Sequence, residues 1–149
     1  MIKRIALSYE AKPHVAEDLV QEIYFAIWRA LPSFRGDASL RTFVARIATN
    51  RCVTHVVRAI KSPVSTELDE QIPAPDQDPE GQAIVADRKI KLASAVRSLP
   101  LAYRQVTMLT LEGLVPREIS EVLGITANAV AIRLSRAKQL LRGLLGDRP

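Results

Sequence analysis

The feature that most restricts the fold of this 149-residue chain is an acidic, proline-rich segment near its middle. The segment reads PVSTELDEQIPAPDQDPEGQAIVAD, and it contains four of the nine prolines. Proline removes a backbone donor and disfavours helix in the residue before it, so neither a long helix nor a central strand fits here. We therefore predict a flexible linker over 63–86, which joins an N-terminal unit (1–62) to a C-terminal unit (87–149).

The charges of the chain divide at nearly the same places. Residues 1–62 hold ten Lys/Arg and five Asp/Glu, and residues 88–149 hold eleven and four. Residues 63–87 hold seven acidic side chains and no basic one. Two basic units around an acidic segment fit two polyanion-binding surfaces, and they fit two ordinary solvated helical surfaces equally well.

Composition also limits the setting in which the chain works. Cys52 is the single cysteine, so no disulfide can form within the chain, and we expect a reducing, cytoplasmic setting. No apolar run is long enough for a bilayer, and the N-terminal residues lack the apolar block of a secretory signal. We therefore expect no membrane insertion.

Apolar spacing predicts two helices in the N-terminal unit. Apolar residues recur at spacings of three and four over 16–31, and Pro32 ends this helix. A second helix is predicted over 40–60, and Asp37 or Ser39 in the preceding loop can cap it. The apolar stripe of the second helix drifts around its axis, which indicates either a bend or a second contact face.

The sequence pattern of the C-terminal unit predicts four helices and no strand. We place them at 84–98, 102–113, 116–123 and 126–145. Pro116 suits the first turn of the third helix, Gly124 suits its end, and Thr126 can cap the fourth. The predicted fold class is therefore all-α, with two small helical domains joined by a flexible linker.

Residues 116–138, PREISEVLGITANAVAIRLSRAK, have the pattern of a helix-turn-helix. The residues spaced to form the small core between its two helices are Ile119, Leu123, Ile125, Val130, Leu134 and Ala137. In such a unit the second helix enters the major groove, where arginine binds guanine or phosphate and asparagine binds adenine. An αα-hairpin inside an ordinary helical protein fits the same pattern.

Two segments together resemble a known family. The first is AEDLVQEIYFAIWRALPSFRGDASLRTFVARIATNR, which resembles the promoter-melting domain of extracytoplasmic-function sigma factors. The second is SLPLAYRQVTMLTLEGLVPREISEVLGITANAVAIRLSRAK, which is similar to the C-terminal domain of the same group. The resemblance implies a transcription initiation subunit whose partners are the RNA polymerase core, promoter DNA and an anti-sigma factor. The family has further helical turns before the first segment, so the N-terminal domain looks shortened and is expected to expose apolar surface.

The resemblance assigns core-polymerase binding to the start of the first helix. The matching residues are Asp18, Gln21 and Glu22, whose spacing of three and four places them on one helix face. Acidic side chains in a first turn also suit the helix dipole without any partner, and both roles can hold together.

The resemblance also assigns reading of the minus-ten element to the following loop and helix. Extruding a base from duplex DNA costs a few kcal/mol, which a polar and cationic surface can offset. The matching residues are Arg35, Gly36, Asp37, Arg46, Asn50, Arg58 and Lys61. Asn50 matches a base-contacting asparagine, although it also fits an ordinary solvated helix position. Phe43 stands where the family has tryptophan, and we expect its ring to pack.

Reading of the minus-thirty-five element falls on the last helix. The matching residues are Asn128, Ala131, Ile132, Arg133 and Arg136. Ala131 and Ile132 replace a basic–serine pair of the family. Alanine makes no hydrogen bond to a base and isoleucine contacts only apolar groups, so recognition should depend on the asparagine and the arginines.

No catalytic, metal or cofactor site is predicted. Cys52 and His55 are three positions apart, but two ligands do not complete a structural zinc site. The acidic residues near the start of the first helix have no adjacent nucleophile or phosphate loop. We expect a non-enzymatic sigma factor. Two alternatives remain: a sigma-like decoy that binds an anti-sigma factor, and a stand-alone helix-turn-helix regulator.

Overall fold

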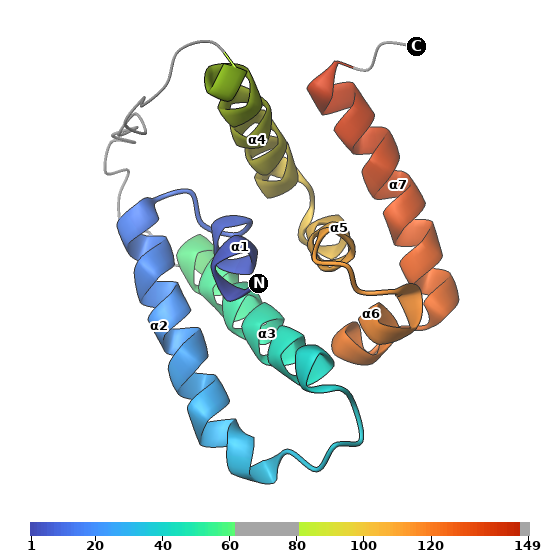
Figure 1. Cartoon of the computed structure of the whole chain (residues 1–149). Helices are drawn as coiled ribbons and strands as arrows, with labels where there is room; N and C mark the ends of the chain where they lie inside the picture. Colours follow the sequence, from blue (N-terminus) through green and yellow to red (C-terminus); the bar gives the residue numbers. More distant parts are fainter. Residues whose placement is uncertain (62–80, 147–149) are drawn as a thin grey trace.

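Every regular element in the described part of the chain is helical. The computed structural model describes residues 1–61 and 81–146. Its elements, shown in Figure 1, are α1 (Ile2–Leu7), α2 (Pro13–Ala30), the 3-10 turn η1 (Leu31–Ser33), α3 (Leu40–Lys61), α4 (Gly81–Ser98), α5 (Leu101–Leu111), α6 (Pro116–Leu123) and α7 (Ala127–Leu145). The all-α prediction is confirmed.

The predicted helix boundaries agree closely with the structure except at the linker and at the start of the first predicted helix. Helix α2 begins at Pro13, three residues before the predicted start, so Asp18 and Glu22 do not lie in its first turn and the expected helix-dipole role is wrong. Helix α4 begins at Gly81, so residues 81–86 of the predicted linker are helical. The last proline before this point is Pro79, and the sequence after Gly81 contains no further proline or glycine until Pro100. The remaining linker residues, 63–80, lie outside the described residues.

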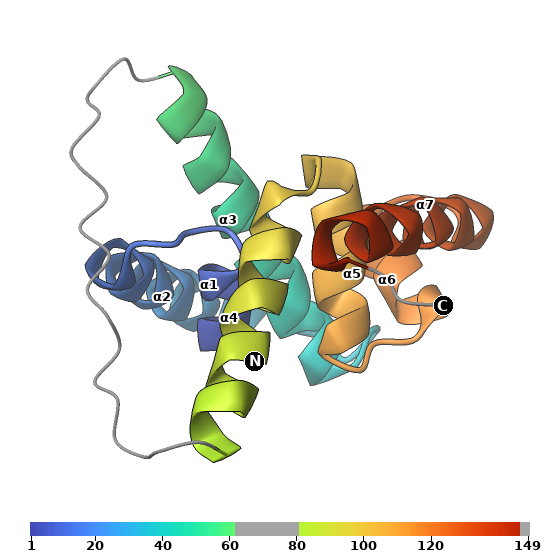
Figure 2. The same ribbon diagram turned by 90° about the horizontal axis from the view of Figure 1, so that it is seen from above.

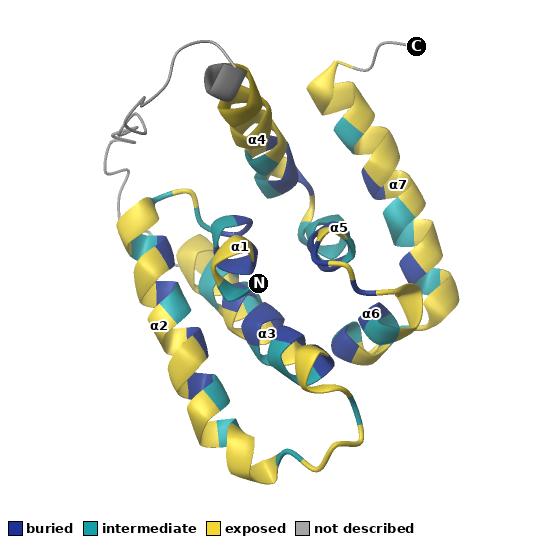
Figure 3. Cartoon of the chain, in the orientation of Figure 1, coloured by how far each residue is buried: buried dark blue, intermediate teal, exposed yellow. Residues whose placement is uncertain are grey.

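Helices α1, α2 and α3 form the N-terminal unit. Ile5 of α1, Leu19 and Ile23 of α2, and Ala48 of α3 are almost completely buried in one cluster. Figure 3 shows the buried side of α2 turned toward α1 and α3, while its opposite side is exposed. Helix α1 is therefore a packed element of the unit.

Helices α4 to α7 form the C-terminal unit. Ile119 of α6 and Val130 of α7 are fully buried, and Leu123, Ile125 and Leu134 pack against them, as predicted. Gly124 joins the two helices with a φ of 67°, a left-handed conformation that glycine adopts without a steric penalty. The hydroxyl of Thr126 accepts a hydrogen bond from the Ala129 amide and caps α7.

The two units share their cores. Ala45 of α3 belongs to the cluster that holds Val106 and Ile119, and Met108 of α5 belongs to the N-terminal cluster. Figures 1 and 2 show α5 and α6 beside α3, on the side away from α2. The drifting stripe of α3 is explained by this second contact face.

None of the helices in the described residues combines the length and the apolar character that a membrane-spanning helix needs.

Candidate protein-binding and nucleic-acid surfaces

The outer side of α2 carries the residues predicted to bind polymerase. Asp18, Gln21 and Glu22 are all exposed. The same side continues with Phe25 and Trp28, whose exposed fractions are 62% and 74%. We call these five residues the docking face. Acidic and aromatic side chains together suit a partner surface that is basic and apolar.

Sequence reasoning missed the aromatic half of the docking face. The buried residues of α2 include Leu19, Ile23 and Ala26, which define its inner side. Phe25 and Trp28 follow Gln21 at spacings of four and three, out of phase with that buried stripe. This difference in helical phase is the feature of the sequence from which the exposure of Phe25 and Trp28 could have been predicted. The guanidinium of Arg29 lies 5.7 Å from the centre of the Phe25 ring, an arrangement that suits a cation–π contact.

The loop before α3 is fixed at both of its ends. The Thr42 amide donates to the Ser39 hydroxyl at 3.1 Å, so Ser39 is the cap, one of the two alternatives that were predicted. The rings of Phe34 and Phe43 pack with their centres 4.9 Å apart. Between these anchors, Arg35, Gly36 and Asp37 are exposed.

The predicted minus-ten residues of α3 form a strip. Arg46, Asn50, Arg58 and Lys61 are exposed on one side of the helix, and we call them the minus-ten strip. At a rise of 1.5 Å per residue, Arg46 and Lys61 are about 22 Å apart along the axis. The loop residues 35–37 lie beyond the other end of the helix, so the structure does not gather these side chains into one pocket.

One member of the strip is already engaged within the chain. The Arg46 guanidinium donates to the backbone carbonyl of Glu121 in α6, at 2.7 Å. Asn50 differs, because its backbone carbonyl accepts from the Thr54 hydroxyl at 2.9 Å while its side chain is exposed.

The predicted reading surface of α7 is mostly exposed. Asn128, Ala131, Ile132 and Arg136 are exposed, and Arg133 is half-buried. The turn that leads into this surface is braced by the Ser120 hydroxyl, which donates to the Ile125 carbonyl at 2.5 Å. The start of α7 is therefore held in a defined orientation with its polar side chains outward.

A polar clamp joins α1 and α3 to the turn after α5. Arg4 of α1 donates to both carboxylate oxygens of Glu112, at 2.5 and 3.0 Å. The Glu112 side chain is only 5% exposed, and its hydrogen bonds to Arg4, followed by its charge, raise the pKa of Arg4. Arg41 of α3 donates to the Glu112 backbone carbonyl. We call Arg4, Arg41 and Glu112 the clamp.

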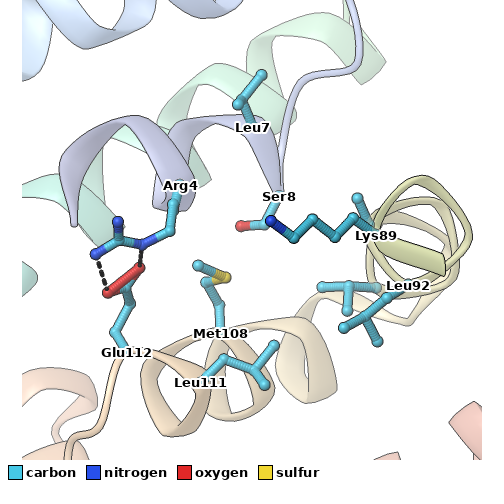
Figure 4. A pocket seen from close by; sticks show the side chains of 10 residues that line it. Arg4, Leu7, Ser8, Lys89, Leu92, Met108, Leu111 and Glu112 are labelled. Atoms are coloured by element: carbon cyan, nitrogen blue, oxygen red, sulfur yellow. Dashed lines mark hydrogen bonds and ion pairs between the residues drawn. The ribbon is translucent and has the colours of Figure 1, made fainter. Parts of the chain in front are cut away.

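The clamp borders a hollow between α1, α4 and α5. Its volume is about 510 Å³, and its lining is mainly apolar. Figure 4 shows the Arg4–Glu112 pair on one side, Leu92 and Lys89 of α4 on the other, and Met108 between them. The two units therefore meet with incomplete packing at this edge.

The buried titratable groups serve packing. Burial raises the pKa of the Tyr9 phenol, and it raises the pKa of the Cys52 thiol to about 12. The Arg104 guanidinium lies 5.6 Å from the Tyr9 ring, and burial lowers the pKa of Arg104. Within the described residues, no three His, Cys, Asp or Glu side chains are grouped as metal ligands.

Comparison with known proteins gives matches over both units. A family model described as Sigma-70 region 2 matches residues 1–60, and one described as Sigma-70, region 4 matches residues 89–141. The RNA polymerase sigma factor NccH of Alcaligenes xylosoxydans xylosoxydans is 29% identical in an alignment that covers 97% of this chain and 80% of NccH.

Two further comparisons concern chain length and fold. The ECF RNA polymerase sigma factor SigG of Mycobacterium tuberculosis (strain CDC 1551 / Oshkosh) is 31% identical over 87% of this chain, but this chain spans only 41% of SigG. The solved structure of the sigma factor RpoE in complex with the anti-sigma factor NepR, from Bartonella quintana, superposes with a TM-score of 0.73. It is 23% identical, and the match covers 99% of this chain and 91% of that one.

Proposed function

The chain belongs to the extracytoplasmic-function group of the sigma-70 family, and we propose that it directs bacterial RNA polymerase to specific promoters and helps to open them. In this proposal it acts in the cytoplasm, and RNA synthesis belongs to the core enzyme. The proposed domains are 1–62 for core binding and promoter melting and, with the start moved to the first residue of α4, 81–149 for upstream recognition.

The observation that carries this proposal is the presence of two exposed cationic helix sides in one chain. The minus-ten strip lies on α3, and the second side begins at Asn128 on α7. Cationic side chains neutralise phosphates, and exposed amides reach base edges. A stand-alone regulator needs only the second of these surfaces, so the pair favours an initiation subunit.

We assign core binding to the docking face of α2. Its acidic residues attract a basic surface, and Phe25 and Trp28 supply apolar area that is removed from water on binding. A face that combines both is expected to hold a partner more tightly than the acidic residues alone.

We assign minus-ten recognition to the minus-ten strip with the loop 35–37. Asn50 has the amide that can bind an unstacked base, and the three basic residues are suited to phosphates. We assign minus-thirty-five recognition to α7, where Asn128 and the exposed Arg136 have the polar groups for base or phosphate contacts. Ile132 can contact a thymine methyl group.

We further propose an anti-sigma factor as the regulatory partner. The related RpoE fold was solved with an anti-sigma factor bound, and the present chain shares that fold over nearly its whole length.

Run-off transcription with purified core polymerase tests the proposal. The template is a library of host-genome fragments, and the 5′ ends of the transcripts are sequenced. We expect transcripts that share two upstream sequence elements and that require both the chain and the core enzyme. A matched reaction without the chain measures background initiation.

Other results would identify the alternatives. Tight binding of duplex DNA without core polymerase, and no transcripts, would indicate a stand-alone regulator. Capture of an anti-sigma factor without any association with core polymerase would indicate a decoy, for which the non-polar Ala131 and Ile132 give a structural reason.

A further inference from the structure

The starting observation is the hollow of about 510 Å³ between α1, α4 and α5. None of the residues proposed to bind polymerase or DNA lines it. Small organic molecules bind in pockets of about 300–1,000 Å³ that are mainly apolar and hold a few polar groups. The size of the hollow therefore suits a small molecule, and its lining determines which class of molecule fits.

The apolar side of the hollow combines buried and exposed side chains. Val96 and Met108 are 2% and 7% exposed, whereas Leu92 and Leu111 are 36% and 56% exposed. In Figure 4 the Met108 side chain extends into the hollow between Glu112 and Leu92. An apolar chain placed against Met108 would remove water from both exposed leucines, which is favourable.

The polar side of the hollow has one net positive charge. Arg4 uses its Nε and Nη2 groups to bind both carboxylate oxygens of Glu112, so these two charges compensate each other. The Ser8 hydroxyl donates to the Ile5 carbonyl at 2.6 Å. The remaining charged group of the lining is the ammonium of Lys89, which takes part in none of the ion pairs formed within residues 1–61 and 81–146.

Lys89 is placed to hold an anionic group. Figure 4 shows its side chain extending from α4 across the hollow toward Ser8. The residues three and four positions before and after Lys89 are all apolar, so no carboxylate of α4 lies one turn away from it. Lys91 differs, because it pairs with Asp87 at 3.1 Å. A ligand carboxylate at the Lys89 ammonium would form a charge-assisted hydrogen bond.

We propose that this hollow is a binding site for a small amphiphile with one apolar chain and one anionic head, of the class of medium-chain alkyl carboxylates. The apolar chain lies against Met108, Leu92 and Leu111, and the head binds the Lys89 ammonium. Leu7 of α1 also lines the hollow, so the ligand contacts both units. The inference goes beyond the proposed function, since binding of this ligand needs neither polymerase nor DNA.

Calorimetric titration of the full-length chain with hexanoate, octanoate and decanoate, each below its micelle concentration, tests the inference. We expect one molecule to bind per chain. Each added methylene group should lower the dissociation constant about fourfold until the ligand fills the hollow. Because the ligand binds the folded chain, decanoate should also raise the midpoint of thermal unfolding.

Two variants identify the contacts of the head and of the apolar chain. Lys89→Ala should raise the dissociation constant of octanoate about tenfold and leave that of octan-1-ol unchanged, because the alcohol does not depend on the positive charge. Ala93→Phe fills the hollow with a ring and should abolish binding of both ligands. The matched control is Lys91→Ala, which removes a charge from the same helix outside the hollow and should bind octanoate like the parent chain. Thermal unfolding shows whether each variant is folded.

The outcomes that would overturn the inference are distinct. Decanoate that does not bind below its micelle concentration, or that binds in several copies per chain, would exclude a specific site. Equal losses of octanoate affinity in Lys89→Ala and Lys91→Ala would mean that net charge attracts the ligand, and unchanged binding by a folded Ala93→Phe chain would place the ligand outside the hollow. A dimer in sedimentation that only Ala93→Phe dissociates would make a second copy of the chain the occupant. None of these results bears on promoter-dependent transcription, so the proposed function is tested separately.

Discussion

The rings of Phe34 and Phe43 pack against each other with their centres 4.9 Å apart and their planes inclined by 52°. Phe34 lies at the start of the loop before α3, and Phe43 lies in the first turn of that helix, so their contact ties the loop to the helix. The expectation that the Phe43 ring packs is confirmed. This contact holds the start of the loop that carries Arg35 and Asp37, which we propose to contact the minus-ten element.

Replacing Phe34 with alanine should therefore loosen the loop with little effect on the rest of the fold. An aromatic pair contributes about 0.5–1.5 kcal/mol beyond its buried area, so we expect a loss of about 1 kcal/mol in the free energy of unfolding. Promoter opening should slow several-fold while affinity for core polymerase stays unchanged. Denaturant unfolding, run-off rates and core-binding titrations measure these effects. Phe34→Leu keeps apolar bulk, so its free energy of unfolding and its rate of promoter opening should lie between those of the parent chain and Phe34→Ala. Equal losses in promoter opening and in core affinity would argue against a local role for Phe34.

Replacing Trp28 with alanine should weaken binding to core polymerase. The indole is 74% exposed in the free chain, so its removal leaves no cavity and should leave the thermal stability nearly unchanged. Large aromatic residues often dominate interface energies, and we expect at least a tenfold rise in the dissociation constant for the core enzyme. Fluorescence anisotropy measures it, and Trp28→Phe serves as the matched variant that keeps a ring. An unchanged dissociation constant for Trp28→Ala would remove the aromatic half of α2 from the docking face.

Replacing Arg133 with alanine should weaken the contact with upstream DNA. If Arg133 binds a phosphate, the slope of log affinity against log salt should fall by about one. Gln139→Ala, farther along the same helix and uncharged, should leave the slope unaltered. Titrations of an upstream DNA fragment at several salt concentrations give both slopes. Arg133 is half-buried, so parallel unfolding curves are needed, and an unaltered slope with normal stability would exclude it from the reading surface.

The Cys52 thiol should be nearly unreactive in the folded chain at pH 8. Burial raises its pKa from the ordinary value of 9.0 to about 12, which lowers the thiolate fraction by about three orders of magnitude. As the pH rises, the folded state loses the Cys52 thiol proton at a higher pH than the unfolded state does. The associated stability is therefore complete below pH 9 and is lost as the pH rises toward 12. Iodoacetamide labelling with and without guanidinium measures the difference, and equal rates would show that Cys52 is accessible.

Much of the fold could be predicted because its signals are local. Pro32 and Pro116 fix helix ends through their missing amide donors, and Gly124 and Thr126 set the turn of the helix-turn-helix. The buried residues between α6 and α7 follow directly from helical periodicity.

The packing of the two units could not be predicted from such local signals. The contact between Arg4 and Glu112 joins residues 108 positions apart, and Met108 looks like an ordinary core residue of either unit. The drifting apolar stripe of α3 indicated a second contact face, but it did not show which helices pack against that face. The exposed position of Trp28 could have been predicted, because Trp28 is out of phase with the apolar stripe that defines the inner side of α2.

Permanganate footprinting of a promoter found by run-off transcription tests most directly whether the chain makes core polymerase open DNA, because permanganate oxidises unpaired thymines. We expect reactive thymines around the minus-ten element only when core polymerase and chain are both present. With Asn50→Ala, the reactivity should fall while core binding remains intact. Protection of the promoter by the chain and core polymerase without any reactive thymine would contradict a role in promoter opening.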